Sequence, residues 1–103
     1  MKITYPDGNE KELETATHYI GVTMTLTGII DAINEYKGVK EPAFVFIAKG
    51  LMTMEDIIFC SKSKSLAESG KKLLGKNVEI SSMQSGNGRK YFIFEEVSNE
   101  ENN

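Results

Sequence analysis

The sequence of 103 residues has a single cysteine, a single histidine, two prolines and no tryptophan. Cys60 has no partner for a disulfide within the chain, and it lies in an apolar run where a small buried side chain is expected. His18 has no second histidine or cysteine near it, so no cluster has the spacing of a metal site. No nucleophile and base can be assembled around His18, and no glycine-rich phosphate-binding motif occurs. The sequence therefore predicts a protein that is not an enzyme and holds no metal or cofactor.

Long apolar runs are also missing. No stretch comes close to the roughly 20 residues that a membrane-spanning helix needs. Residues 1–7 do not resemble a secretory signal peptide. A chain of this length forms one domain and can bury a sufficient core. We therefore expect a single cytoplasmic domain with no membrane partner, and one unpaired cysteine agrees with a reducing compartment.

The net charge of −3 is unevenly distributed along the chain. Residues 1–56 carry nine acidic and five basic residues, residues 57–94 carry two acidic and seven basic residues, and residues 95–103 carry four acidic residues. The weakly acidic total argues against strong nonspecific binding to duplex DNA, which needs many phosphate contacts. The basic central part is compatible with a local groove that binds phosphates.

The hydrophobic pattern is that of short strands around one helix. Residues 22–27 alternate apolar side chains with threonines, which favours a half-buried strand, and Gly28 in its continuation indicates a bulge or bend. Residues 43–48 are apolar on both faces, which indicates either a strand buried on both sides or a binding surface on one side. A Ser-x-x-Glu capping box at Ser65–Glu68 opens a helix that stops at Gly75.

We therefore expect an all-β fold with one helix, in which a five-stranded antiparallel OB-fold barrel is closed at one end by that helix. A short N-terminal hairpin and a linker, residues 1–21, precede this OB-fold domain, residues 22–97. Residues 34–42 are expected to form a polar loop, and residues 98–103 a disordered acidic tail. The expected elements lie near these residues: strands 22–33, 43–49, 56–61, 77–83 and 90–97, and helix 65–74.

Residues 22–97 resemble the bacterial and phage single-stranded DNA-binding proteins. The resemblance rests on four short elements in the same order: Leu26-Thr27-Gly28, Phe44-Val45-Phe46-Ile47-Ala48, Leu66-Ala67-Glu68 and Leu73-Leu74-Gly75-Lys76-Asn77-Val78. The chain departs from that family in having no tryptophan and no acidic tail that ends in Pro-Phe. The resemblance implies an OB-fold, binding of single-stranded DNA in replication, recombination or transfer of DNA, and assembly as a homodimer or higher homo-oligomer.

Binding to a single strand needs cations that follow the phosphates and flat side chains that stack on bases. The candidate cations are Lys37, Lys40, Lys49, Lys62, Lys64, Arg89 and Lys90. The candidate stacking residues are Tyr36, Phe44, Phe46, Phe59 and Tyr91. Strand alternation places Phe44 and Phe46 on the same face. No residue is committed to reading a base or a 2′-hydroxyl, so we expect little sequence preference and leave both DNA and RNA open as ligands.

A second hypothesis is an OB-fold module that binds another protein and no nucleic acid. The negative total charge and the missing tryptophan favour this hypothesis, whereas the basic stretch 62–90 favours nucleic acid. The salt dependence of binding to labelled oligothymidine separates the two hypotheses, because only phosphate contacts release counterions.

Overall fold

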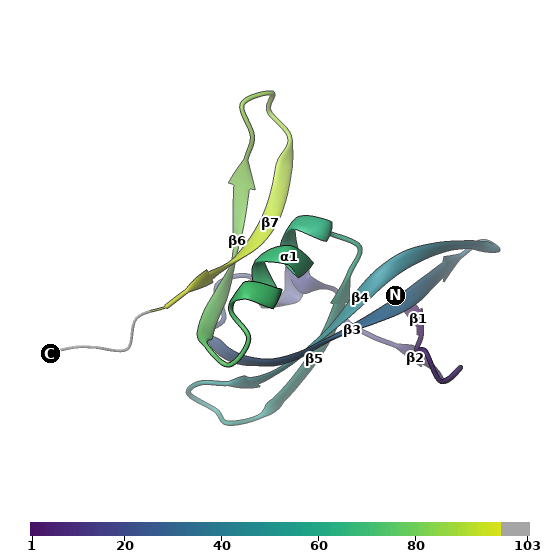
Figure 1. Cartoon of the computed structure of the whole chain (residues 1–103), viewed down its shortest axis with the longest axis horizontal. Helices are drawn as coiled ribbons and strands as arrows, with labels where there is room; N and C mark the ends of the chain where they lie inside the picture. The colour runs from purple at the N-terminus through teal and green to yellow at the C-terminus, as the bar shows by residue number, and fades with distance from the viewer. Residues whose placement is uncertain (98–103) are drawn as a thin grey trace, which may run out of the picture.

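A computed structural model describes residues 1–97 of the chain (Figure 1). Within these residues, seven antiparallel strands, one α-helix and one 3-10 helix (η1) are formed. This confirms the predicted class, all-β with one helix; the expected acidic tail, residues 98–103, lies outside the described residues. The element bounds are β1 Lys2–Thr4, β2 Glu10–Glu12, η1 Ala16–Tyr19, β3 Met24–Tyr36, β4 Val39–Gly50, β5 Asp56–Ser61, α1 Lys64–Lys72, β6 Asn77–Gln84 and β7 Lys90–Glu96.

The strands form one open sheet and not the closed barrel that the sequence predicts. The strand order is β2-β1-β3-β4-β5, and β6 pairs with the start of β3 and with β7. The helix α1 packs against β7 and lies over the sheet near the start of the β6–β7 hairpin (Figure 1). No helix within residues 1–97 is long and apolar enough to cross a membrane.

The sheet stays open because the two edges that would close it are already hydrogen-bonded. Closing the barrel would pair β5 with β7. On β5, the N–H of Cys60 donates to the carbonyl of Glu14 at 2.9 Å. On β7, the hydroxyl of Ser65 donates to the carbonyl of Phe92 at 2.8 Å, and that of Ser69 accepts the N–H two residues further along β7 at 2.8 Å. The chain before η1 therefore occupies the free edge of β5, and two serines of α1 occupy the free edge of β7. These bonds replace the β5–β7 pairing that would close a barrel.

β3 and β4 form a hairpin that is longer than the sequence predicts. Its outer part, residues 32–43, extends beyond the main body and is called the β3–β4 arm (Figure 1). The strands pair up to a two-residue turn, Lys37-Gly38, whose φ angles of 52° and 79° fit a tight hairpin turn. The prediction of a polar loop over 34–42 is therefore wrong. A solvent-facing hairpin tip needs no apolar alternation, so its strands carried no hydrophobic signal.

One face of the sheet packs a cluster of aromatic rings. Phe46 and Phe59 are fully buried and stack with ring centroids 5.2 Å apart. Tyr19 stacks on the Phe59 ring at 5.1 Å, and Phe94 meets the Phe46 ring edge-on at 5.4 Å. Two corrections follow. Phe46 and Phe59 are core residues that a base cannot reach, and the stretch 15–21 is not only a linker, because η1 carries Tyr19 into the core.

The other face of β3, β4 and β5 is covered by the N-terminal hairpin. Ile3 is fully buried in a cluster with Val45 and Cys60, and β1 is hydrogen-bonded to β3. This explains most of the apolar character of residues 43–48: Phe44, Phe46 and Ala48 meet the aromatic cluster, and Ala43 and Val45 meet the hairpin, whereas Ile47 lies half-buried outside both clusters. The N-terminal hairpin therefore shares the sheet and the core with the rest of the domain, and it covers the strand face that the sequence left open as a binding surface.

Helix α1 begins one residue earlier than expected and has a different cap. The hydroxyl of Ser63 accepts the N–H of Leu66 at 3.1 Å, so Ser63 is the N-cap. The capping box predicted for Ser65 and Glu68 is therefore wrong, since Ser65 bonds to β7 instead. The helix ends before the predicted glycine stop: its last residue is Lys72 and its C-cap is Leu73, and Gly75 follows in the next turn with a φ of 83° in the left-handed region.

Gly70 allows α1 to approach the sheet closely. A Cβ at this position would lie 2.9 Å from Ile29 Cδ1 and 3.0 Å from Phe94 Cδ2. We expect Gly70→Ala to lower the free energy of unfolding by about 1 kcal/mol, because overpacking of about 1–3 kcal/mol outweighs the helix propensity gain of about 1 kcal/mol. Urea denaturation measures this change. Gly86→Ala is the matched control, since its Cβ would meet nothing within 4 Å, and a stabilised Gly70→Ala variant would contradict the packing.

Candidate nucleic-acid interface

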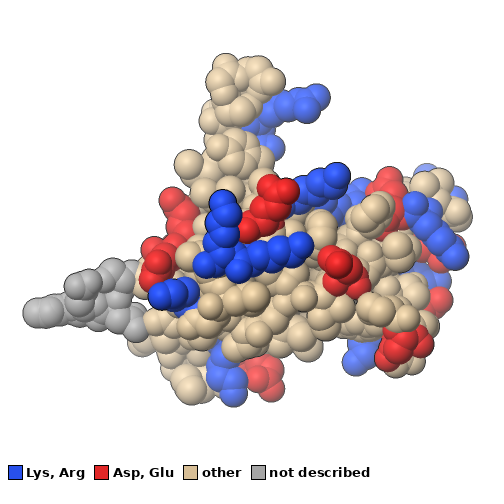
Figure 2. Space-filling model, in the orientation of Figure 1, with Lys and Arg blue, Asp and Glu red and all other residues tan. Residues whose placement is uncertain are grey.

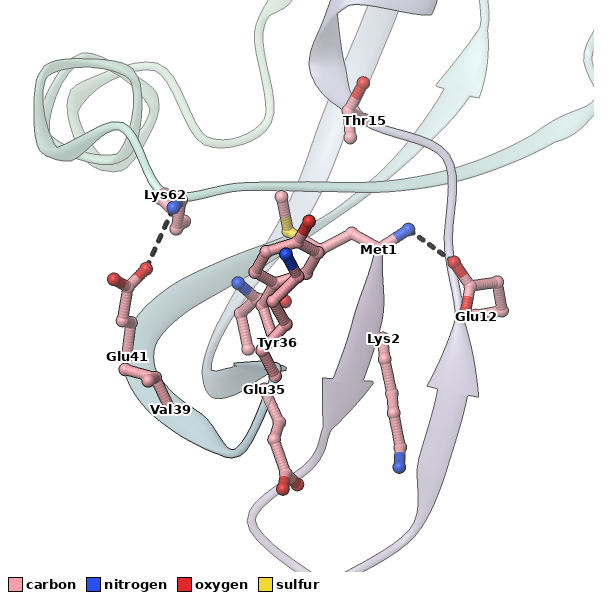
Figure 3. A pocket seen from close by; sticks show the side chains of 11 residues that line it. Met1, Lys2, Glu12, Thr15, Glu35, Tyr36, Val39, Glu41 and Lys62 are labelled. Atoms are coloured by element: carbon pink, nitrogen blue, oxygen red, sulfur yellow. Dashed lines mark hydrogen bonds and ion pairs between the residues drawn. The ribbon is translucent and has the colours of Figure 1, made fainter.

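A hollow of about 860 Å³ lies between the N-terminal chain and the β3–β4 arm (Figure 3). It is called the hairpin pocket. In the register of the arm, Tyr36 lies opposite Val39. Two residues earlier, Asn34 lies opposite Glu41, so these four side chains share one face of the arm. The lining residues are Met1, Lys2, Glu12, Thr15, Asn34, Glu35, Tyr36, Lys37, Val39, Glu41 and Lys62.

Tyr36 gives the hairpin pocket an exposed aromatic surface. Its side chain is 67% exposed, and Figure 3 shows its ring near the middle of the pocket. The Lys37 Nζ lies 5.3 Å from the ring centroid, within the range of a cation–π contact. At the rim, the Lys62 Nζ lies 2.8 Å from Glu41 Oε1 in a pair that water reaches. A flat, solvent-facing ring beside cations is an arrangement on which a base can stack.

A second hollow of about 400 Å³ adjoins the hairpin pocket, because Glu41 and Lys62 line both. It is called the Phe44 hollow. Phe44 is half-buried, packs against the aromatic core and lines this hollow. Lys64, the first residue of α1, lines it as well. A path along the surface therefore runs from the hairpin pocket, past Lys62, to the start of the helix.

Lysines on α1 and just after it extend this path. Figure 2 shows basic side chains gathered over α1 near the middle of the view, with acidic side chains among them, and α1 itself carries the exposed Glu68. On α1 and in the turn after it, four exposed lysines form no ion pair within residues 1–97: Lys64, Lys71, Lys72 and Lys76. The last three were not among the candidates taken from the sequence. The basic excess of residues 57–94 is the sequence feature that could have pointed to them. This set of four, with Lys62, is called the lysine row.

The β6–β7 hairpin carries a separate group of candidates. It stands away from the main body, and it points in another direction than the β3–β4 arm (Figure 1). Arg89 and Lys90 lie exposed at its tip, and neither forms an ion pair within the described part of the chain. Tyr91 is 38% exposed and lies opposite Met83 in the register. This hairpin therefore offers cations and one aromatic ring at a distance from the hairpin pocket.

The structure brings together only part of the predicted site. Phe46 and Phe59 lie in the core, and Lys49 is ion-paired with Asp56 at 3.6 Å near the far end of β4. Lys40 lies exposed on the β3–β4 arm. Five candidates border the two adjoining hollows: Tyr36, Lys37, Phe44, Lys62 and Lys64. Three more lie on the β6–β7 hairpin: Arg89, Lys90 and Tyr91.

Neither Cys60 nor His18 lines the hairpin pocket or the Phe44 hollow, although His18 lines a third hollow that shares Met1, Glu12 and Thr15 with the hairpin pocket. Burial raises the pKa of the Cys60 thiol, which keeps it protonated. His18 Nδ1 lies 3.1 Å from Glu14 Oε1, and both side chains are exposed. Within residues 1–97, no three His, Cys, Asp or Glu side chains are placed to hold a metal ion. What the surface offers is charge for phosphates and rings for bases.

No protein-family model matches the chain, and no match was found among curated proteins or among solved structures. The fold and the surface therefore carry the functional argument by themselves. They define an all-β domain with one helix, which has a lysine row on one side and two adjoining hollows at one end of that row.

Proposed function

We propose that this protein binds single-stranded DNA with little sequence preference, in replication, recombination or transfer of DNA in the cytoplasm. The observation that carries the proposal is the lysine row, which starts at the two hollows and continues along α1. Exposed cations in a row can follow a phosphate backbone, and they attract any sequence equally.

Aromatic side chains at one end of the lysine row support the same proposal. Tyr36 and Phe44 line the two hollows that share Lys62. Each base stacked on such a ring contributes about 1–3 kcal/mol, and any base can stack. Opening the exposed pair of Lys62 with Glu41 costs little, since surface ion pairs are worth about 0–1 kcal/mol. Lys62 is therefore available to a phosphate.

The size of the surface suits a single strand more than a duplex. The nine-residue helix α1 spans about 14 Å at 1.5 Å per residue, and the hollows extend the path beyond its N-terminus. Single-strand sites on OB-fold domains cover about 4–16 nucleotides. The chain as a whole is acidic, with a net charge of −3, so it lacks the large excess of basic residues that the many phosphate contacts of duplex binding require. RNA stays open as a ligand, since no group is committed to a 2′-hydroxyl.

A protein-binding module is the second candidate, and exposed methionines favour it. Met52 is 89% exposed and Met54 is 65% exposed in the turn between β4 and β5. Flexible methionine side chains are common on surfaces that bind other proteins. A homodimer belongs to the first proposal as well. Its contact would lie on the β6–β7 hairpin, where Met83 and Tyr91 form an exposed apolar pair.

Fluorescence anisotropy with labelled oligothymidine, oligouridine and a duplex of equal length tests the proposal at low and moderate salt. We expect oligothymidine to bind at low salt and the duplex to bind more weakly, because stacking needs unpaired bases. Light scattering on the same samples reports the oligomeric state. If no oligonucleotide binds at low salt, where the electrostatic attraction is strongest, the nucleic-acid proposal is wrong and the protein-binding module takes its place.

A further inference from the structure

We propose that the hairpin pocket binds one purine base, and that this contact adds a local base preference to otherwise indifferent binding. The inference rests on the proposed single-strand function and assigns a ligand to the pocket within that function. Its starting point is Asn34. This side chain is 5% exposed, and Asn34 is the one polar residue that is buried among residues 1–97.

Asn34 has unused hydrogen-bonding capacity. Its side chain lines the hairpin pocket, yet within residues 1–97 its amide makes no hydrogen bond to protein. Buried amides in proteins almost always have partners, because a buried donor or acceptor left without one destabilises the fold. An amide that is withdrawn from solvent and faces a large hollow is therefore suited to a ligand that has both a donor and an acceptor.

The charges around the pocket point to a neutral ligand. Lys62 lies 2.8 Å from Glu41, and the Nζ of Lys2 lies 3.4 Å from Glu10 Oε1. Glu35 also lines the pocket. Positive and negative groups are paired here, so a phosphate inside the pocket gains little net attraction. A base is neutral, so it does not depend on charge attraction inside the pocket. The phosphates on either side of that base in the strand remain near the lysine row.

The shape of the pocket fits a planar ring. Tyr36 follows Asn34 by two residues on β3, so both side chains lie on the same face of the arm. The ring of Tyr36 stacks on the base, and the Asn34 amide pairs with a donor and an acceptor on the edge of the base. A volume of about 860 Å³ is ample for a nucleoside. A purine is favoured because its two rings cover more of the tyrosine than one ring does.

Amide NMR spectra of the full chain test this inference with free nucleosides. Adenosine at millimolar concentration is expected to shift the Asn34 side-chain amide and the Tyr36 backbone amide, and thymidine to shift them less. Tyr36→Ser is expected to abolish the shifts, and Tyr36→Phe, which keeps the ring, to retain them. Val22→Ser, at an exposed apolar residue just before β3, is the control and should leave them unchanged. Asn34→Leu should also abolish adenosine binding.

A parallel measurement separates failure of the inference from failure of the proposed function. Oligothymidine that carries one adenine is expected to bind about tenfold more tightly than pure oligothymidine, as for a base read by an asparagine amide. Asn34→Leu or Tyr36→Ser should remove this difference. If oligothymidine binds but adenosine causes no shift, or if thymidine shifts the signals equally, the purine pocket is wrong and the single-strand function stands. If adenosine shifts the signals but no oligonucleotide binds, the pocket stands and the function is wrong.

Discussion

A tenfold rise in salt concentration is expected to weaken oligothymidine binding by about two to four orders of magnitude. The affinity for a single strand falls with a log–log slope of about −0.7 for each phosphate neutralised. With roughly three to five lysines engaged, the slope is about −2 to −4. Anisotropy titrations over a range of salt concentrations measure it. Binding that does not change with salt would show that the lysine row does not contact phosphates.

The same titrations on paired lysine variants locate the contacts. The double variant Lys62→Ala, Lys64→Ala is expected to bind all sequences more weakly and to flatten the slope by about 1.4, since two phosphate contacts are lost. The matched control removes two other lysines, Lys11 and Lys49. Lys11 lies exposed on β2, and Lys49 is ion-paired with Asp56, so this variant has the same net charge without touching the row. Equal loss in both variants would indicate a general charge effect and not a site.

Phe59→Ala is expected to lower the free energy of unfolding by about 3–5 kcal/mol. The Phe59 side chain is fully buried and its ring contacts Phe46 and Tyr19, so truncation leaves a cavity bounded by rings that cannot collapse. Such a loss is a large part of the roughly 5–15 kcal/mol that stabilises a domain of ordinary stability. Urea denaturation followed by circular dichroism measures it.

An exposed aromatic residue provides the control for this truncation. Tyr91→Ala removes a ring from the surface of the β6–β7 hairpin, where it is 38% exposed, and should change the free energy of unfolding by much less than Phe59→Ala does. If Phe59→Ala unfolds no more easily than Tyr91→Ala, then Phe59 does not lie in the core.

The elements that the sequence predicts well are those with strong local signals. β5 has the predicted bounds of 56–61, Gly75 lies in the turn just after α1, and the bulge lies beside Gly28. Each depends on neighbouring residues alone: a short apolar run between polar ends, or a glycine that interrupts a regular pattern. The helix N-cap shows the limit of such signals. Two serines, Ser63 and Ser65, could each cap, and only contact with β7 decides between them.

The candidate site could be predicted only in part, because alternation along a strand gives two faces without saying which one is covered. Phe44 and Phe46 share a face, and that face turned out to be the core, so Phe46 is lost as a stacking residue. The N-terminal hairpin that covers the opposite face has weak apolar patterning of its own. Asn34 is an ordinary polar residue in the sequence, and only the packing of that hairpin over the arm makes it a buried amide facing a hollow.

The hydroxyls of Ser65 and Ser69 on the edge of β7 also bear on aggregation. An open sheet exposes unpaired N–H and C=O groups, to which a strand of another molecule can add. A helix bonded to the middle of β7 leaves no room for such a strand there. At the opposite end of the sheet, β2 consists of three exposed charged residues, Glu10, Lys11 and Glu12. Charged side chains on an edge strand disfavour its pairing with the edge strand of another molecule. Two serines and a short charged strand thus give this open sheet the resistance to edge-to-edge growth that small barrels obtain from closing their sheet.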